Sequence, residues 1–104
     1  MINSRQKGKR GELEFVRLLE EHGFEARRGQ QFRGGHDSPD VLCDLPIHWE
    51  VKNTNHLQLM AAYWQAITDC PVGKIPAVAH KRNHGEWFVT LGASNFLDLL
   101  KRMS

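Results

Sequence analysis

The segment 38–52 carries the residue types and spacing that could do chemistry. Asp40 lies near its start, and Glu50 and Lys52 lie at its end. Two apolar runs separate the two acids, and residues 44–46, Asp-Leu-Pro, interrupt these runs as a tight turn would. The segment therefore predicts a β-hairpin with one carboxylate on each strand.

Alternation along the second strand of this hairpin would place His48, Glu50 and Lys52 on one face of a sheet. Asp40 would add a second carboxylate from the neighbouring strand. Grouped charge beside a core is costly unless it has partners. A divalent cation is the natural partner for two carboxylates, and Mg²⁺ prefers oxygen ligands of this kind.

The rest of the chain predicts the elements that must position the hairpin. Helices are expected from Asn3 or Ser4 to about His22, from residues 53–55 to about Asp69, and from Ser94 towards the end. Strands are expected over residues 24–28, 41–43, 47–51, 76–80 and 87–91. The resulting order, α-β-β-β-α-β-β-α, predicts an α/β fold with a mixed β-sheet flanked by helices.

Apolar residues at helical spacing predict which side of each helix faces the core. The expected inward residues are Val16 and Leu19 on the first helix, Leu57, Met60, Ala61, Trp64 and Ile67 on the second, and Phe96, Leu97, Leu100 and Met103 on the third. Gly8 and Gly11 are poor helix formers, which indicates either close backbone approach or a frayed terminus.

The composition predicts one domain over residues 1–104, because the 104 residues contain 40% apolar residues, enough for one core. No apolar run approaches the ~20 residues that would cross a bilayer, so we expect a soluble, cytoplasmic protein. Cys43 and Cys70 do not form a Cys-x-x-Cys pair, and the six histidines lack paired spacing. These patterns disfavour a disulfide scaffold and a structural zinc site.

Positive charge is concentrated in the first third of the chain. Although the formal net charge is only +2, eight of the 14 Lys and Arg residues precede position 34. An uneven basic footprint suits a phosphate-rich partner. A solvated helix face is the alternative explanation of the same charges.

Several motifs together resemble the PD-(D/E)xK nuclease superfamily. Pro39-Asp40 and Glu50-Val51-Lys52 match its two signature pieces, residues 8–12 match the Gly-x-x-x-Glu of an N-terminal helix, and Gly23-Phe24 enters the first strand. Within the superfamily the chain is most similar to archaeal-type Holliday-junction resolvases and small phage endonucleases. The resemblance covers nearly the whole chain, since residues 75–83 and 87–90 also look like the phage proteins.

This resemblance implies a restriction-endonuclease-like fold and Mg²⁺-dependent hydrolysis of DNA, with Mn²⁺ able to substitute. The implied catalytic residues are Glu12, Asp40, Glu50, Lys52 and Gln65. The implied metal ligands are Asp40, Glu50, Glu12 and the backbone carbonyl of Val51. A metal ion lowers the pKa of an attacking water and neutralises charge in the transition state, and a lysine can orient that water.

The resemblance also implies partners: DNA, including branched DNA, and a second copy of the chain in a homodimer. The expected DNA-contacting residues are Arg5, Lys7, Lys9, Arg10, Arg27, Arg28, Arg33, Gly34, Gly35, Ser38, Lys81 and Arg82. Ser38 is the candidate for the serine that the resolvases carry beside their glycine loop. Trp49, Trp64 and Phe88 are candidates for the dimer face, should they prove exposed.

Each of these residues also has a structural explanation. Glu50 and Lys52 could form an exposed ion pair worth under ~1 kcal/mol, and Glu12 could complement a helix dipole. Asp40 could belong to a turn, and Gln65 could be a surface residue. At the level of function, the alternatives are a non-catalytic nucleic-acid-binding module on the same fold, or a nickase of the same superfamily in DNA repair or phage DNA processing.

Overall fold

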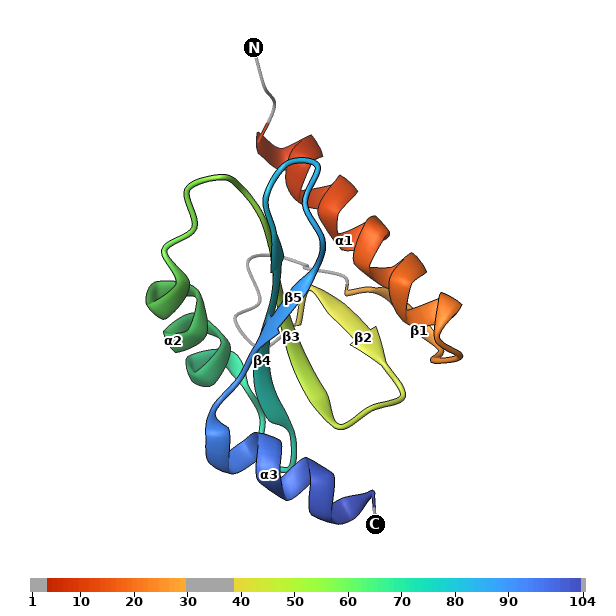
Figure 1. Ribbon diagram of the computed structural model, residues 1–104, viewed down its shortest axis with the longest axis vertical. Coiled ribbons are helices and arrows are strands. Elements are labelled where there is room, and N and C mark those ends of the chain that lie inside the picture. The colour runs from red at the N-terminus through yellow and green to blue at the C-terminus, as the bar shows by residue number, and fades with distance from the viewer. Residues whose placement is uncertain (1–3, 30–38, 104) are drawn as a thin grey trace.

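The computed structural model describes residues 4–29 and 39–103, with side chains from residue 6 onward. These ranges contain three helices and five strands in the order α-β-β-β-α-β-β-α, which confirms the expected α/β fold. The elements are α1 (Ser4–Glu21), β1 (Ala26–Arg28), β2 (Val41–Cys43), β3 (Ile47–Asn53), α2 (Leu59–Asp69), β4 (Ile75–Lys81), β5 (Phe88–Thr90) and α3 (Ala93–Arg102) (Figure 1).

The five described strands form one mixed sheet in the order β1-β2-β3-β4-β5. β3 pairs in parallel with β4, from Ile47 opposite Ile75 to Asn53 opposite Lys81, whereas the other neighbouring strands are antiparallel. Parallel neighbours need a crossover connection, and α2 supplies it. β3, which carries Glu50 and Lys52, therefore lies in the middle of the sheet.

The two faces of the sheet are covered by different helices, α1 on one side and α2 on the other (Figure 1). Phe15 of α1 packs edge-on against Trp49 of β3, with ring centroids 4.7 Å apart. On the opposite face, Ala62 and Ala66 of α2 pack against Val78 of β4. Because alanine has a short side chain, α2 can lie close to the sheet.

The predicted start of the second helix is wrong. Residues 53–55 were expected to cap it, but β3 continues through Asn53 and α2 begins at Leu59. The backbone N–H of Thr54 still donates to the carbonyl of Lys81, at 3.1 Å. Strand pairing with β4 thus outweighs the local capping signal, and a loop separates β3 from α2. The first helix, by contrast, ends as expected before Gly23, which has a φ of +90°.

Most of the predicted inward residues of the second and third helices are exposed, although Leu57 packs against the buried cluster of α2 as expected. Met60 and Trp64 of α2 are more than half exposed, while Ala62 and Ala66 are buried. On α3 the side chains expected inside are between 48% and 81% exposed, namely Phe96, Leu97, Leu100 and Met103. Leu99 is the α3 residue that packs against the core, and no residue of this helix is buried.

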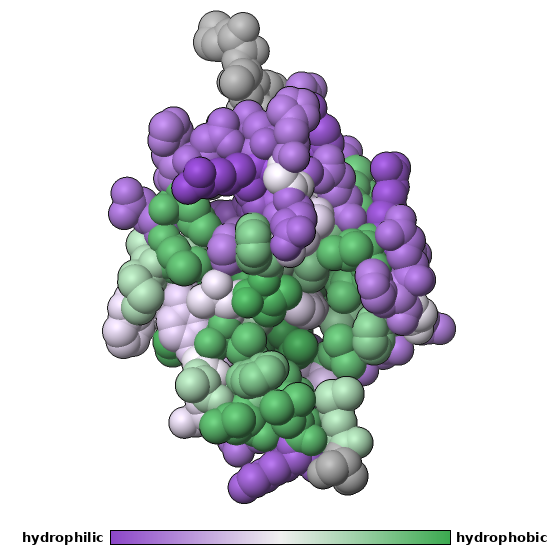
Figure 2. All heavy atoms as spheres, viewed as in Figure 1, coloured by the Kyte–Doolittle hydropathy of each residue, from purple (hydrophilic) through white to green (hydrophobic). Residues whose placement is uncertain are grey.

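The exposed surface divides into a polar end and an apolar end. Figure 2 shows hydrophilic residues over the end where α1 begins, and hydrophobic residues over β5 and α3 towards the other end. No helix in the described ranges is long and apolar enough to cross a membrane.

Candidate metal and nucleic-acid site

Asp40 is fixed at the start of β2 by the backbone around Gly29. A Cβ atom at Gly29 would lie 1.9 Å from the carbonyl oxygen of Pro39, so this close approach requires glycine. The N–H of Gly29 donates to the carbonyl of Asp40, and the N–H of Asp40 donates to the carbonyl of Trp49, both at 2.9 Å. The backbone of Asp40 is therefore tied to β3.

The Asp40 side chain and the end of β3 meet in the interior. Oδ2 of Asp40 accepts a hydrogen bond from the buried N–H of Val51, at 2.8 Å. Glu50 precedes Val51 and is buried, and its Oε1 lies 3.6 Å from Nζ of Lys52. The structure thus brings together the two carboxylates and the ammonium of the hairpin. His48 shares the face of Glu50 and is also buried.

Burial raises the pKa values of both hairpin acids. Burial raises the pKa of Glu50 to about 7, and the negative charge of Asp40 adds to the effect while Lys52 opposes it. The pKa of Asp40 is also raised by burial, although the N–H of Val51 and the charge of Lys52 oppose the shift. The pair therefore holds protons more tightly than exposed carboxyl groups do.

Glu12 joins these acids from α1. A Cβ at the preceding Gly11 would lie 2.9 Å from Cβ of Asn53, so the absence of a side chain lets α1 lie against β3. Oε1 of Glu12 accepts a hydrogen bond from Nε of Arg28, at 2.8 Å. Burial raises the pKa of Glu12, the Arg28 hydrogen bond opposes the shift, and the charge of Asp40 adds to it.

Gln65 lies on the other side of the site, on α2. It is exposed and lines a hollow of about 330 Å³ together with Lys52. Its side-chain amide donates to Oδ2 of Asp69, at 2.6 Å. The negative charge of Asp69 in turn contributes to the raised pKa values of Asp40 and Glu50.

Asp69 is the residue that sequence reasoning missed, since it was taken only as the end of a helix. The available signal was its spacing, because Asp69 is four residues after Gln65 and therefore shares its helix face. The sequence does not show that this face approaches β3.

The donor set fits Mg²⁺. Among residues 6–29 and 39–103 no group of three His, Cys, Asp or Glu side chains could hold a metal ion. Mg²⁺ does not require one, since it commonly binds through one or two carboxylates and keeps several waters. Asp40 and Glu50 supply two carboxylates whose pKa values are raised chiefly by burial, and the charge of Asp40 raises that of Glu50 further. A bound cation would favour the ionised form of both.

The basic residues expected to contact DNA differ in exposure and in their partners. Lys9, Arg10, Arg27 and Arg82 are exposed. Lys7 and Arg10 meet Lys81 around a hollow of about 320 Å³ near the polar end of the molecule. Arg28 and Lys81 instead form ion pairs within the protein, the first with Glu12 at 2.8 Å and the second with Glu14 at 2.7 Å.

The remaining expected contacts lie outside the described residues. Arg33, Gly34, Gly35 and Ser38 belong to the segment 30–38, and the side chain of Arg5 precedes residue 6. Of the aromatic residues expected at a dimer face, Trp49 is buried in the core, whereas Trp64 and Phe88 are exposed.

Comparison with known proteins finds no match: no family model, no curated protein and no solved structure matches this chain. The resemblance to PD-(D/E)xK nucleases therefore stays a prediction carried by motifs.

Proposed function

We propose that this chain is a Mg²⁺-dependent DNA endonuclease of the PD-(D/E)xK type, with a restriction-endonuclease-like fold. The observation that carries the proposal is the meeting of Asp40 and Glu50, two buried carboxylates with raised pKa values, beside the ammonium of Lys52. An exposed ion pair does not account for this arrangement, because both acids are buried. The mixed sheet, with one acid directly before β2 and the other on β3, agrees with the fold that the motifs imply.

In this proposal Asp40 and Glu50 would hold the metal ion with the carbonyl of Val51, and Glu12 would position a water beside it. The bound ion supplies charge neutralisation at the phosphate and a water of lowered pKa. Lys52, next to Glu50 and partly exposed, orients the water and stabilises developing negative charge. Gln65 lines the same hollow as Lys52, where it hydrogen-bonds the substrate or its water.

The N-terminal half of α1 and the β4–β5 loop supply the proposed DNA-binding surface. Lys7 and Arg10 line one hollow there, beside the Lys81–Glu14 ion pair, and phosphate contacts of such residues position DNA without reading its sequence. A branched substrate with two coordinated cuts would require a homodimer. The exposed apolar side chains of α3 supply its candidate face.

Cleavage of labelled DNA tests the proposal. Four-way junctions, flaps, nicked duplex, single strands and linear duplex are incubated with the protein and Mg²⁺ or Mn²⁺, and the products are separated on denaturing gels. We expect metal-dependent nicking that is fastest on a branched substrate and is abolished by Asp40→Asn or Glu50→Gln. Binding to DNA, measured in EDTA, should persist in both variants.

The outcome separates the alternatives. Binding without cleavage of any substrate would favour a non-catalytic DNA-binding module. Equal rates on branched and linear DNA would remove the resolvase interpretation and leave a nickase. Wild-type activity in either variant would refute the assigned site.

A further inference from the structure

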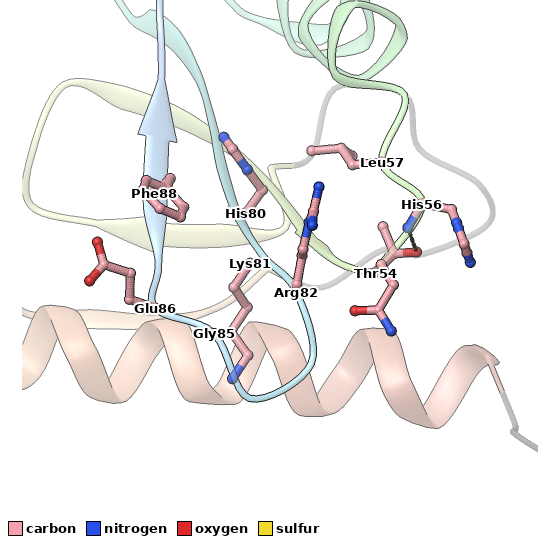
Figure 3. A pocket seen from close by; sticks show the side chains of 10 residues that line it. Thr54, His56, Leu57, His80, Lys81, Arg82, Gly85, Glu86 and Phe88 are labelled. Atoms are coloured by element: carbon pink, nitrogen blue, oxygen red, sulfur yellow. Dashed lines mark hydrogen bonds between the residues drawn. The ribbon is translucent and has the colours of Figure 1, made fainter.

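A larger hollow lies beside the proposed metal site, between the loop after β3 and the β4–β5 hairpin (Figure 3). Its volume is about 670 Å³, which falls in the range of small-molecule sites. The residues that matter for its chemistry are Thr54, His56 and Leu57 from the loop, and His80, Arg82 and Phe88 from β4, the hairpin and β5.

The two walls of this hollow are tied together by hydrogen bonds. The N–H of Thr54 donates to the carbonyl of Lys81 at 3.1 Å. The N–H of Asn83 donates to Oδ1 of Asn55 at 2.9 Å. These bonds join the loop after β3 to the β4–β5 hairpin, so the hollow is formed before any ligand enters.

Strand register connects this hollow to Lys52. Lys52 of β3 lies opposite His80 of β4, and His80 lies opposite Phe88 of β5. Opposite residues share a face of the sheet, and adjacent strands are ~4.8 Å apart, which places Phe88 roughly 10 Å from Lys52. Residues 54, 56 and 57 line both this hollow and the smaller one that contains Lys52 and Gln65. A DNA strand bound at the metal site can therefore place an adjacent nucleotide in the larger hollow.

The lining combines a flat aromatic surface with positive charge. Phe88 is 55% exposed, and its ring stacks on that of His80 with centroids 5.9 Å apart and an angle of 27°. In Figure 3 the Arg82 side chain extends between His80 and Leu57, while the carboxylate of Glu86 points away from it. Exposed aromatic rings stack on nucleobases, and arginine binds phosphate.

We infer that the hollow binds one nucleotide adjacent to the scissile phosphate, with its base stacked on Phe88 and its phosphate held by Arg82. This inference rests on the proposed nuclease function and specifies its substrate. A base inside a duplex is stacked on its neighbours and cannot reach Phe88. The substrate is therefore DNA with an unpaired nucleotide next to the cut, as at a branch point or flap.

Two matched oligomers test this subsite without requiring cleavage. A fluorescein-labelled thymidine 12-mer and an abasic 12-mer carry the same phosphates, but only the first has bases. Their affinities are measured by fluorescence anisotropy in EDTA. Wild-type protein should bind the thymidine oligomer more tightly than the abasic one. Phe88→Ala should weaken thymidine binding by roughly 5- to 100-fold and leave abasic binding unchanged.

Three variants serve as controls. Val89→Ala removes a side chain of similar exposure, 48%, from the opposite face of the same strand, and should leave both affinities unchanged. Phe88→Trp keeps an aromatic ring and should restore the preference for thymidine. Arg82→Gln removes a phosphate contact and should weaken binding of the two oligomers by the same factor. Circular dichroism checks that each variant is folded.

Three results would overturn the inference. The first is a wild-type protein that shows no preference for the thymidine oligomer. The second is an equal loss of affinity for both oligomers in Phe88→Ala. The third is a changed sedimentation coefficient in Phe88→Ala, which would assign Phe88 to a contact between copies of the chain.

The proposed function fails separately, in the cleavage assay with Mg²⁺. A protein that prefers thymidine through Phe88 but cuts no DNA would keep the nucleotide subsite and lose the nuclease. A protein that cuts DNA but shows no base preference would keep the nuclease and lose the subsite.

Discussion

Glu50 is a carboxylate buried next to a second carboxylate, and both have raised pKa values. Each pKa unit corresponds to about 1.4 kcal/mol, so ionising Glu50 in the folded protein costs on the order of 3 kcal/mol more than ionising an exposed glutamate. Most of the opposing attraction comes from one partly exposed ammonium, that of Lys52. Such an arrangement stabilises the fold poorly at neutral pH, and metal binding is the role that best accounts for it.

The pH dependence of stability should report this cost. Because the folded pKa of Glu50, about 7, exceeds its ordinary value of 4.5, its contribution to stability is complete below pH 4.5 and is lost as pH rises through 7. We expect the free energy of unfolding of the wild type, from urea titrations without metal, to fall between pH 5 and pH 8. Glu50→Gln should reduce this fall by up to about 3 kcal/mol.

The control for this measurement is Glu20→Gln, which changes an exposed glutamate of α1. This variant should follow the wild-type curve. If the stability curve of Glu50→Gln runs parallel to that of the wild type across the whole pH range, the pKa of Glu50 is not raised in the folded protein.

Magnesium should stabilise the folded protein, and more strongly at high pH. Mg²⁺ binds ionised carboxylates, so protons compete with it as pH falls through the raised pKa of Glu50. We expect saturating Mg²⁺ to raise the melting temperature more at pH 8 than at pH 6, and EDTA to reverse the increase. Asp40→Asn and Glu50→Gln should lose the increase, and Glu20→Gln should retain it. An equal increase in all variants would place the ion elsewhere.

At the residue scale, the hairpin residues of the site could be predicted from sequence, whereas Asp69 could not. Asp40, Glu50 and Lys52 lie on one hairpin, where the two-residue period of a strand fixes which side chains share a face. Asp69 acts on the two acids only through its charge, and it does so because α2 packs against β3 and β4. Its contribution depends on helix placement, and local spacing does not encode that placement.

At the scale of elements, α1 is held against β3 by a glycine. Gly8 and Gly11 both lie in this helix, but only the second of them lacks space for a side chain, because Asn53 lies against it. The sequence left close backbone approach and a frayed terminus as alternatives for the two glycines, and the structure shows close approach at Gly11. At Gly8 nothing lies within 4 Å of an added Cβ atom.

This difference predicts opposite effects for two identical substitutions. Gly8→Ala should raise the free energy of unfolding by up to ~1 kcal/mol, because alanine favours a helix over glycine. Gly11→Ala should lower it, because the new Cβ atom would lie 2.9 Å from Cβ of Asn53 and would push α1 away from β3. Urea denaturation measures both variants. A higher free energy of unfolding in Gly11→Ala would show that α1 and β3 leave room for a side chain at this position.

The order and type of the elements could be predicted, but the packing of the later helices could not. A 3.6-residue apolar period marks the residues that are to be buried without stating what buries them. The residues that pack against the core are the small Ala62 and Ala66 on α2, and Leu99 on α3. Met60 and Trp64 of α2, and Phe96, Leu97 and Leu100 of α3, are left at the surface.

At the scale of the whole molecule, α3 is an amphipathic helix without a buried residue. Phe96, Leu100 and Met103 are spaced by four and three residues and form one exposed stripe with Leu97 beside them. Contiguous exposed apolar surface commonly marks an interaction site. The stripe on α3 lies away from the polar end that carries Lys7 and Arg10, so a partner on this helix would leave that part of the proposed DNA surface open (Figure 1).

The proposed function calls for a homodimer, and we propose that the second copy of the chain covers this stripe. A two-fold axis would place the same stripe of each copy against the other, and such a contact is self-complementary. Sedimentation velocity should therefore show a dimer for the wild type. Leu97→Glu and Leu100→Glu should each shift it to a monomer while the circular dichroism spectrum is retained, because a carboxylate would be buried at the contact.

Leu13→Glu provides the matched control, since Leu13 is an exposed leucine on α1. It should leave the dimer intact. Monomeric variants that still nick DNA once, but no longer cut both strands of a four-way junction together, would link the stripe on α3 to junction resolution. Variants that keep both the wild-type sedimentation coefficient and paired cutting would exclude this helix from the dimer contact.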